Sequence, residues 1–557
     1  MDEKITIYQV LPRLQTNALH KNVVNGTIQE NGCGKLGDFT LAFLKRIKSI
    51  GYSHIWYTGL IEHATQTDYS QYDIKANNAC IVKGKAGSPY AIRDYYDIDP
   101  DLSNDIPHRM NEFKALVNRT HKAGLKMIID FVPNHVSREY KSDAKPSNVS
   151  DLGEHDDTSK SFDANNNFYY ITGKGLKLDF NPTSDSPTYI EYPAKATGND
   201  QFSNTPNQYD WYETVKLNYG IDYIHDKATH FHPIPNTWKK MLQILLFWAA
   251  KGIDGFRCDM AEMVPCEFWN WCIPQVKAKH PNMIFIAEVY NPSLYRQYIE
   301  FGHFDYLYDK VGLYDTLRKI CTGHASAYSI TSCWQQLQDL QPYMLNFLEN
   351  HDEQRIASDF FCNDPRKALP ALMISSCMNT NPFMVYAGQE LGEKGMDAEG
   401  YSGIDGRTSI FDYWHVPSLY KIYKGERNMN AQERALYKYY KKIISTIKQE
   451  SCIYNGKFFD LMYVNNLGNG FDGNNLYAFL RNTGHEAILA VANFSNEDKI
   501  CNINIPSHAI SYMQIREGSY RATDLIHGTM QQIMIKADQC TTVKIMGYDS
   551  VLLKFNW

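Results

Sequence analysis

Four apolar runs in this sequence each end in side chains that could do chemistry together. Arg257 and Asp259 lie two positions apart in "GIDGFRCDMAE", and Glu288 closes the run "NMIFIAEV". The runs "LKMIIDFVPNH" and "YMLNFLENHD" end in further carboxyl, amide and imidazole groups. The candidate set holds three carboxylates, two imidazoles and one guanidinium: Asp259, Glu288, Asp352, His135, His351 and Arg257.

Cleavage of a glycosidic bond with retention of configuration needs two carboxyl groups about 5 Å apart. Asp259 suits the nucleophile, because the adjacent guanidinium of Arg257 lowers the pKa of a carboxyl and keeps it ionised. Glu288 follows "IFIA", and an apolar setting raises the pKa of a carboxyl as an acid catalyst requires. Asp352, with the imidazoles, can bind sugar hydroxyls and favour the positively charged transition state.

Each motif by itself also has a structural interpretation. Arg257 and Asp259 could be a buried ion pair at a strand end, and an Asp or Asn at such a position often caps the following helix or turn. Four polar clusters at four strand ends favour a shared site over four separate caps.

The elements that would position these residues follow from apolar periodicity. From residue 1 to about 450, short apolar runs alternate with amphipathic stretches, which predicts parallel strands joined by crossover helices. Eight such runs predict an α/β fold, a closed (β/α)8 barrel with its active site at the carboxyl ends of the strands. Side chains alternate along a strand, so Arg257 and Asp259 would face inward while Phe256 and Cys258 face the helices.

Two segments depart from this alternation. About 100 residues separate "DFVPNH" from the helix near Trp238, and connections of that length are usually functional or an inserted subdomain. After residue 453, short period-two runs separated by Gly, Asn and Asp predict a small antiparallel domain. We therefore predict a barrel over residues 1–135 and 226–450, an inserted domain over 136–225 after the third strand, and a C-terminal β-sandwich over 453–557.

Composition restricts the partners and the compartment. The net charge is −6 and there is no long basic run, which argues against nucleic acid as a partner. No apolar run is long enough to span a membrane. The twelve cysteines form no Cys-x-x-Cys pair and the N-terminus lacks a signal-peptide pattern, so the sequence as it stands indicates a cytoplasmic protein. A secreted or periplasmic protein with its leader removed is the alternative, and the oligomeric state is not predicted.

The ordered motifs resemble those of glycoside hydrolase family 13, the α-amylase family. "DFVPNH", "GFRCD", "IAEV" and "ENHD" are similar to its first, second, third and fourth conserved regions, and "SPYAIRDYYDIDPDL" to its loop after the second strand. The resemblance implies Asp259 as nucleophile, Glu288 as acid/base and Asp352 as transition-state stabiliser. It further implies sugar-binding roles for Tyr90, His135, Arg257 and His351.

One departure from the family pattern and one match to it concern leaving-group and metal binding. Many relatives carry Lys-His after the nucleophile, where this chain has Glu262 and Met263. Asn134 matches a common calcium ligand of the family, although an amide there can also serve a turn. The expectation is that no cofactor is required and that Asn134 is a candidate calcium ligand.

The function expected from these residues is retaining hydrolysis of α-1,4-linked glucans or maltooligosaccharides, with an oligosaccharide or polysaccharide as the partner. A glucanotransferase or glucoside isomerase would use the same nucleophile and acid, so the catalytic residues do not separate these activities. A non-catalytic carbohydrate-binding relative is the third alternative, and such relatives typically lose a catalytic carboxylate that this chain keeps.

Overall fold

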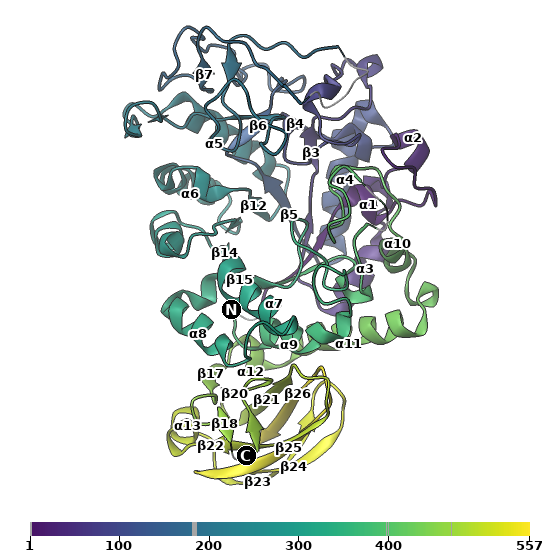
Figure 1. Cartoon of the computed structure of the whole chain (residues 1–557), viewed down its shortest axis with the longest axis vertical. Helices are drawn as coiled ribbons and strands as arrows, with labels where there is room; N and C mark the ends of the chain where they lie inside the picture. Colours follow the sequence, from purple (N-terminus) through teal and green to yellow (C-terminus); the bar gives the residue numbers. More distant parts are fainter. Residues whose placement is uncertain (1–2, 181–186, 397, 399, 469) are drawn as a thin grey trace.

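The computed structural model describes residues 3–557 except 181–186, 397, 399 and 469. Its centre is a closed barrel of eight parallel strands, in the order β1-β16-β15-β14-β13-β12-β5-β2. The strands are β1 (Thr6–Val10), β2 (His54–Tyr57), β5 (Lys126–Phe131), β12 (Gly255–Cys258), β13 (Ile284–Ala287), β14 (Tyr306–Tyr308), β15 (Met344–Phe347) and β16 (Phe383–Tyr386). Each lies within one of the eight apolar runs, which confirms the predicted barrel (Figure 1).

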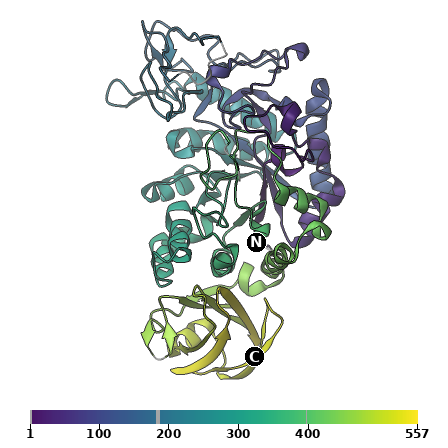
Figure 2. The same cartoon turned by 45° about the vertical axis from the view of Figure 1, so that its right-hand side comes forward.

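Helices surround the barrel on its outer side (Figure 2). The main ones are α3 (Leu41–Ile50), α4 (Arg109–Lys122), α5 (Asn236–Ala249), α6 (Cys266–Lys279), α7 (Asp315–Cys321), α8 (Ser329–Leu337), α9 (Leu369–Cys377), α10 (Pro417–Lys424) and α11 (Ala431–Gln449). Thr40 caps α3 by accepting a hydrogen bond from the amide of Phe43, and Gly51 ends this helix at a φ of 128°, which favours glycine.

The barrel strands present two different faces. Phe256 and Cys258 on β12 are buried in the large core formed with the helices. The barrel interior is a separate apolar cluster that includes Ile7, Trp56, Ile128, Ile286, Tyr308, Leu345 and Met384. Arg257 pairs in register with Asp130 of β5 and Ile286 of β13. The alternation of strand faces therefore places the guanidinium inside the barrel, as the sequence predicts.

An inserted segment follows the third barrel strand and contains three small antiparallel sheets. They pair β6 (His135–Ser137) with β9 (Thr214–Lys216), β7 (Tyr170–Ile171) with β8 (Ala194–Lys195), and β10 (Ile221–Asp222) with β11 (Ala228–Thr229). A further antiparallel pair, β3 (Ile61–His63) and β4 (Ile92–Ile98), lies after β2. The boundaries that we place at residues 136 and 225 stay a prediction.

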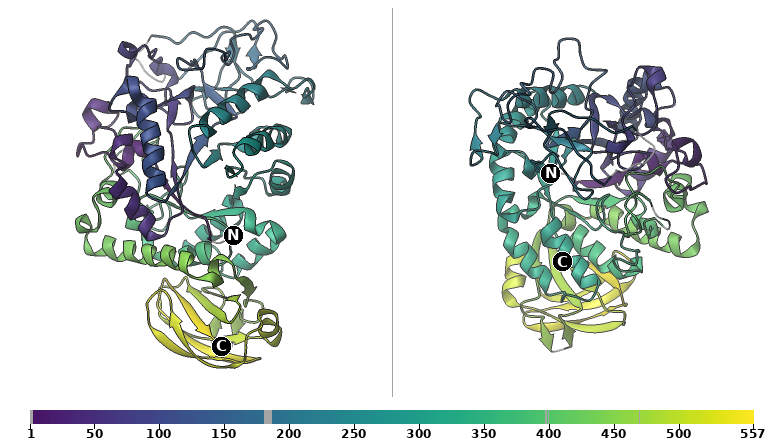
Figure 3. Two further views of the ribbon diagram at one scale, coloured as in Figure 1. Left: turned by 180° about the vertical axis from the view of Figure 1, so that it is seen from behind. Right: turned by 45° about the horizontal axis from the view of Figure 1, so that its top comes forward.

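The C-terminal part is antiparallel. A six-stranded sheet has the order β17-β20-β21-β26-β23-β24, and β22 pairs with β25. The bounds are β17 (Lys457–Asp460), β20 (Leu476–Thr483), β21 (Glu486–Asn493), β22 (Lys499–Ile505), β23 (Gly518–Asp524), β24 (Met530–Ile535), β25 (Gln539–Ile545) and β26 (Asp549–Asn556). This sheet and the inserted segment lie at opposite ends of the molecule (Figures 1 and 3). Among the described helices, none has the length and hydropathy needed to cross a bilayer.

Candidate active site

Arg257 lies at the centre of the predicted site, buried inside the barrel on β12. Its Nη1 is 2.6 Å from Asp259 Oδ1, and its Nη2 is 2.8 Å from Glu288 Oε2. Its Nε donates to the hydroxyl of Tyr308 at 3.1 Å, and Asp130 Oδ1 lies 3.7 Å from Nη1. One guanidinium thus holds the two predicted catalytic carboxylates side by side.

Asp259 directly follows β12 and is buried. Burial raises the pKa of Asp259 well above its ordinary value; Arg257 lowers it, and negative charge on Glu288 raises it again. We predicted that Arg257 would lower this pKa and keep Asp259 ionised. The guanidinium acts in the predicted direction, but desolvation outweighs it.

Glu288 lies at the end of β13, in a more polar setting than its sequence neighbours suggest. Its Oε2 forms the ion pair with Arg257 and accepts a hydrogen bond from the amide of Met260 at 2.8 Å. Its Oε1 accepts from the hydroxyl of Tyr290 at 2.6 Å. The predicted apolar setting of Glu288 is therefore incomplete, because Ile286 lies in the same interior cluster while Arg257, Met260 and Tyr290 bring polar groups to the carboxyl.

Asp352, His351 and Tyr90 lie together on the adjacent side of the mouth. His351 Nε2 is 3.1 Å from Asp352 Oδ2 and also bonds the hydroxyl of Tyr90, and its Nδ1 is 2.8 Å from Gln9 Nε2. The rings of Tyr90 and His351 are stacked at 5.1 Å. Desolvation and then Glu288 raise the pKa of Asp352, although 41% of its side chain remains exposed at the mouth.

Asn134 and His135 lie where β5 leads into the inserted segment. Asn134 Oδ1 accepts a hydrogen bond from the ammonium of Lys216 at 2.6 Å, and Asn134 Nδ2 donates to the carbonyl of Gly198 at 2.7 Å. A positive charge therefore already contacts the oxygen that we predicted as a calcium ligand, and the residues present do not fit a divalent cation there. No described group of three or more His, Cys, Asp or Glu side chains could hold a metal ion.

Comparison with known proteins agrees with this arrangement. Residues 29–408 match the family model described as the catalytic domain of alpha amylase.

The chain belongs to the α-amylase family.

Similar proteins cover most of this α-amylase-family chain. It is 23% identical over 488 residues to alpha-amylase 2 of Dictyoglomus thermophilum, covering 85% of this chain and 67% of that protein. It is 21% identical to neopullulanase 2 of Thermoactinomyces vulgaris, covering 75% and 59%. The fold is similar to a maltogenic alpha-amylase of Thermotoga neapolitana, with a TM-score of 0.62 and 19% identity over 99% of both chains. The family makes the chain a glycosidase that needs no organic cofactor.

Tyr290 and Glu262 are site residues of this family member that sequence reasoning did not assign. Tyr290 donates to Glu288, and the amides of Tyr290 and Asn291 donate to Glu262 Oε2 at 3.1 and 3.0 Å. Glu262 occupies a position where many relatives carry lysine, and here its carboxylate binds the loop that follows Glu288. The sequence shows that Glu262 departs from the family pattern, but it does not show that Glu262 bonds Tyr290, 28 residues away.

Trp56, Tyr308 and Gln9 complete the inner wall. The rings of Trp56 and Tyr308 each lie 5.4 Å from the Arg257 guanidinium, within the range of cation–π attraction. Gln9 bonds His351 from β1. An aromatic or amide residue within an apolar strand gives no signal that it faces a guanidinium, so the sequence offered no means of finding these three.

A cavity of about 290 Å³ adjoins the site. It is lined by His351 and Asp352 and by the segment after β16, from which Arg407 Nε donates to the carbonyl of Asp352 at 2.6 Å. Tyr401 of that segment bonds Tyr212 of the inserted segment through their hydroxyls at 2.8 Å. Two loops that are distant in sequence thus meet beside the mouth of the barrel.

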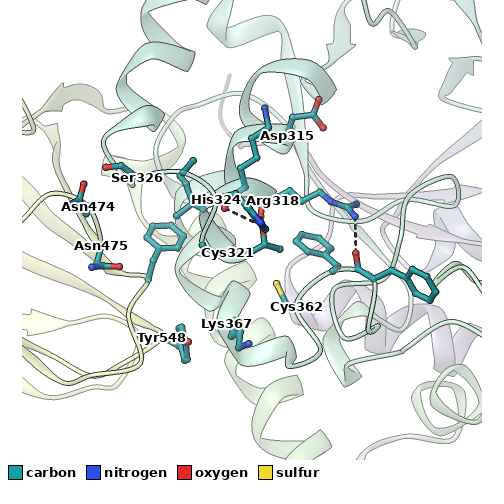
Figure 4. Close-up of a pocket in the computed structure, with 18 of the residues that line it drawn as sticks. Asp315, Arg318, Cys321, His324, Ser326, Cys362, Lys367, Asn474, Asn475 and Tyr548 are labelled. Carbon is teal, nitrogen blue, oxygen red and sulfur yellow. Dashed lines mark hydrogen bonds between the residues drawn. The ribbon is translucent and has the colours of Figure 1, made fainter.

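Another cavity, of about 1190 Å³, lies away from the mouth between α7 and the C-terminal sheet (Figure 4). Arg318 of α7 donates to the carbonyl of Phe360 along its wall at 3.1 Å, and Asn474, Asn475 and Tyr548 face it from the C-terminal part. None of the predicted catalytic residues lines this cavity. The candidate active site is therefore the smaller, buried cluster around Arg257.

Proposed function

We propose that this α-amylase-family protein is a retaining α-glycoside hydrolase acting on α-1,4-linked glucans or maltooligosaccharides. The observation that carries the proposal is the shared guanidinium, with Asp259 at 2.6 Å and Glu288 at 2.8 Å from two nitrogens of Arg257. Two carboxylates that contact the same guanidinium lie close together, which supports the separation of about 5 Å that retention requires.

In the first step of the proposed mechanism, Asp259 attacks the anomeric carbon as the bond to the leaving oxygen breaks. Glu288 transfers its proton to that oxygen, so the leaving chain departs as a neutral alcohol. The hydroxyl of Tyr290 fixes one oxygen of Glu288, and Arg257 with the Met260 amide fixes the other. These contacts aim the carboxyl before the substrate arrives.

In the second step, the ionised Glu288 removes a proton from water, and the water oxygen attacks the anomeric carbon. The bond to Asp259 breaks and the carboxylate is regenerated. Asp352 lies at the mouth beside His351 and Tyr90, where its negative charge can stabilise the oxocarbenium-like transition state. Tyr90, His351 and His135 are proposed to bind the sugar ring and its hydroxyls.

The names of similar proteins support the substrate class. They include alpha-amylases, a neopullulanase and a cyclomaltodextrinase, and one structure similar in fold is an alpha-amylase complexed with acarbose. The cavity beside Asp352 measures about 290 Å³, the low end of the range for small-molecule sites.

Product analysis tests the proposal. The protein is incubated with maltoheptaose, and chain length and anomeric configuration are followed by NMR. Shorter chains released first as α-anomers are the expected result. A ladder of chains longer than the substrate would establish glycosyl transfer instead, and β-anomeric products would exclude the retaining mechanism. Parallel incubations with isomaltose, sucrose and trehalose define the linkage.

Asp259→Asn tests the nucleophile. Because the amide cannot form the glycosyl intermediate, we expect kcat to fall by several orders of magnitude. Each tenfold loss corresponds to an increase of about 1.4 kcal/mol in the activation free energy. Maltooligosaccharide binding, measured by calorimetry, should persist. Activity within about tenfold of the wild type would refute the assignment of Asp259.

A further inference from the structure

Lys216 of β9 is a buried cation that the proposed catalysis does not use. Its side chain is 2% exposed, and lysine is rarely buried unless it is paired. The ammonium lies 2.5 Å from Asp200 Oδ1 and 2.6 Å from Asn134 Oδ1. Burial lowers the pKa of Lys216, and the charge of Asp200 opposes this by favouring the ammonium form.

The two oxygens come from different parts of the chain. Asn134 lies three residues after the third barrel strand, β5, which ends at Phe131. Asp200 belongs to the inserted segment, which lies at the top of Figure 1. The amide of Lys216 donates to the carbonyl of Ala196 at 2.9 Å, so β9 also holds the strand of chain that leads to Asp200. Lys216 therefore contacts the barrel edge at Asn134 and the rest of the inserted segment at Asp200 and Ala196.

The juncture formed by Asn134, Asp200 and Lys216 also supports His135. Lys216 pairs in register with His135 across β6 and β9. Gly198 packs so closely on this pair that a methyl group there would lie 2.9 Å from His135 Cβ and 2.4 Å from Thr214 Oγ1. The segment from Gly198 to Asp200 thus packs against the side chain of His135. Contacts that fix this segment therefore also position His135.

We infer that the ammonium of Lys216 is a built-in cation that takes the place of a divalent metal at Asn134 and Asp200, fixing the inserted segment and positioning His135. Calcium prefers six to eight oxygen ligands, commonly with several carboxylates. Here one carboxylate and one amide oxygen converge on a single positive charge, which lysine supplies with its own N–H donors. The part of the inference that concerns His135 rests on the proposed function, whereas the structural part does not.

Local hydrogen exchange tests the structural part on the full chain. The amide of Thr197 donates to Gln201 and that of Leu217 to Asn134, at 3.1 and 2.9 Å, so both report on the juncture. In Lys216→Met, which keeps the apolar stem and removes the charge, we expect exchange of peptides covering these amides to accelerate at least about tenfold. Lys195→Met is the matched control, since Lys195 lies in the neighbouring β8 and bonds the carbonyl of Arg138 at 3.3 Å.

Calcium and EDTA provide the second arm. In the wild type, exchange of these peptides should be the same in EDTA and in millimolar CaCl2. Slower wild-type exchange on adding calcium would overturn the inference, because it would place a metal where the ammonium lies. Exchange in Lys216→Met equal to that of the wild type would also overturn it.

Steady-state kinetics test the positioning of His135. We expect Lys216→Met to raise KM for maltoheptaose about tenfold with a smaller change in kcat, whereas Lys195→Met leaves both unchanged. A uniform loss of active protein would lower kcat alone, and that result would contradict a positioning role. If the exchange result holds while the enzyme hydrolyses no glucan, the proposed function fails and the built-in cation stands.

Discussion

Replacing Arg257 by methionine should shift the rising limb of the pH dependence of catalysis to higher pH. The guanidinium contacts Asp259 at 2.6 Å and Glu288 at 2.8 Å, both buried. For unit charges about 4 Å apart at an effective dielectric constant near 20, the contact with Asp259 contributes about 4 kcal/mol in favour of the ionised carboxylate. That energy corresponds to about 3 pKa units, and water entering the vacated space should reduce the shift to one or two.

The sign follows from the state that the guanidinium favours. Arg257 stabilises the anion of Asp259, so its removal raises the pKa of this carboxyl. The nucleophile then ionises at higher pH. The rising limb of the profile of kcat/KM should move to higher pH by about one to two pH units, and activity should fall most on the acid side.

The assay is kcat/KM for 4-nitrophenyl α-maltoside between about pH 4 and pH 10. This leaving group needs little protonation, so the rising limb reports ionisation of Asp259. Arg355→Met is the matched control, because Arg355 is equally buried and bonds Glu349 at 2.8 Å without contacting the catalytic carboxyls. It should lose thermal stability and keep the pH profile. If Arg257→Met loses the same factor at every pH, electrostatic control by Arg257 is refuted and only positioning remains.

Three further predictions concern neighbouring groups. Tyr290→Phe removes a 2.6 Å hydrogen bond to Glu288 and should lower kcat on maltoheptaose about tenfold, because a hydrogen bond to a charged group contributes about 1.5 kcal/mol. We expect little loss on the nitrophenyl glycoside. Equal losses on both substrates would contradict a role for Tyr290 at the acid. Glu288→Gln should lose several orders of magnitude on maltoheptaose and recover most of that on a glycosyl fluoride, whereas no difference between the substrates would argue against Glu288 as the acid. Burial raises the pKa of Asp130 to about 6, so the folded protein binds a proton that the unfolded chain releases. The stability of the wild type relative to Asp130→Asn should therefore fall as pH rises from about 4 to about 6, by up to about 3 kcal/mol, visible as the pH dependence of the difference in Tm; a constant difference would exclude this proton uptake.

The strands, their order along the chain and the inward face of β12 were all predictable, because they depend on local patterns. Apolar runs of strand length, amphipathic stretches between them and glycine at helix ends are properties of neighbouring residues. Polar residues at the ends of these runs must meet once the strands are parallel, since their carboxyl ends share one mouth. The sequence by itself therefore determined the barrel and the set of side chains at its opening.

Only the tertiary structure decided how those side chains are paired. The setting of Glu288 depends on Tyr290 and Met260, which its own strand does not reveal, and the pKa of Asp259 depends on how much water the closed barrel excludes. Lys216 reaches Asn134 across 82 residues of sequence. Hydrogen bonds and desolvation act over a few ångströms of space, and the distance between two residues along the chain does not determine their distance in the folded protein.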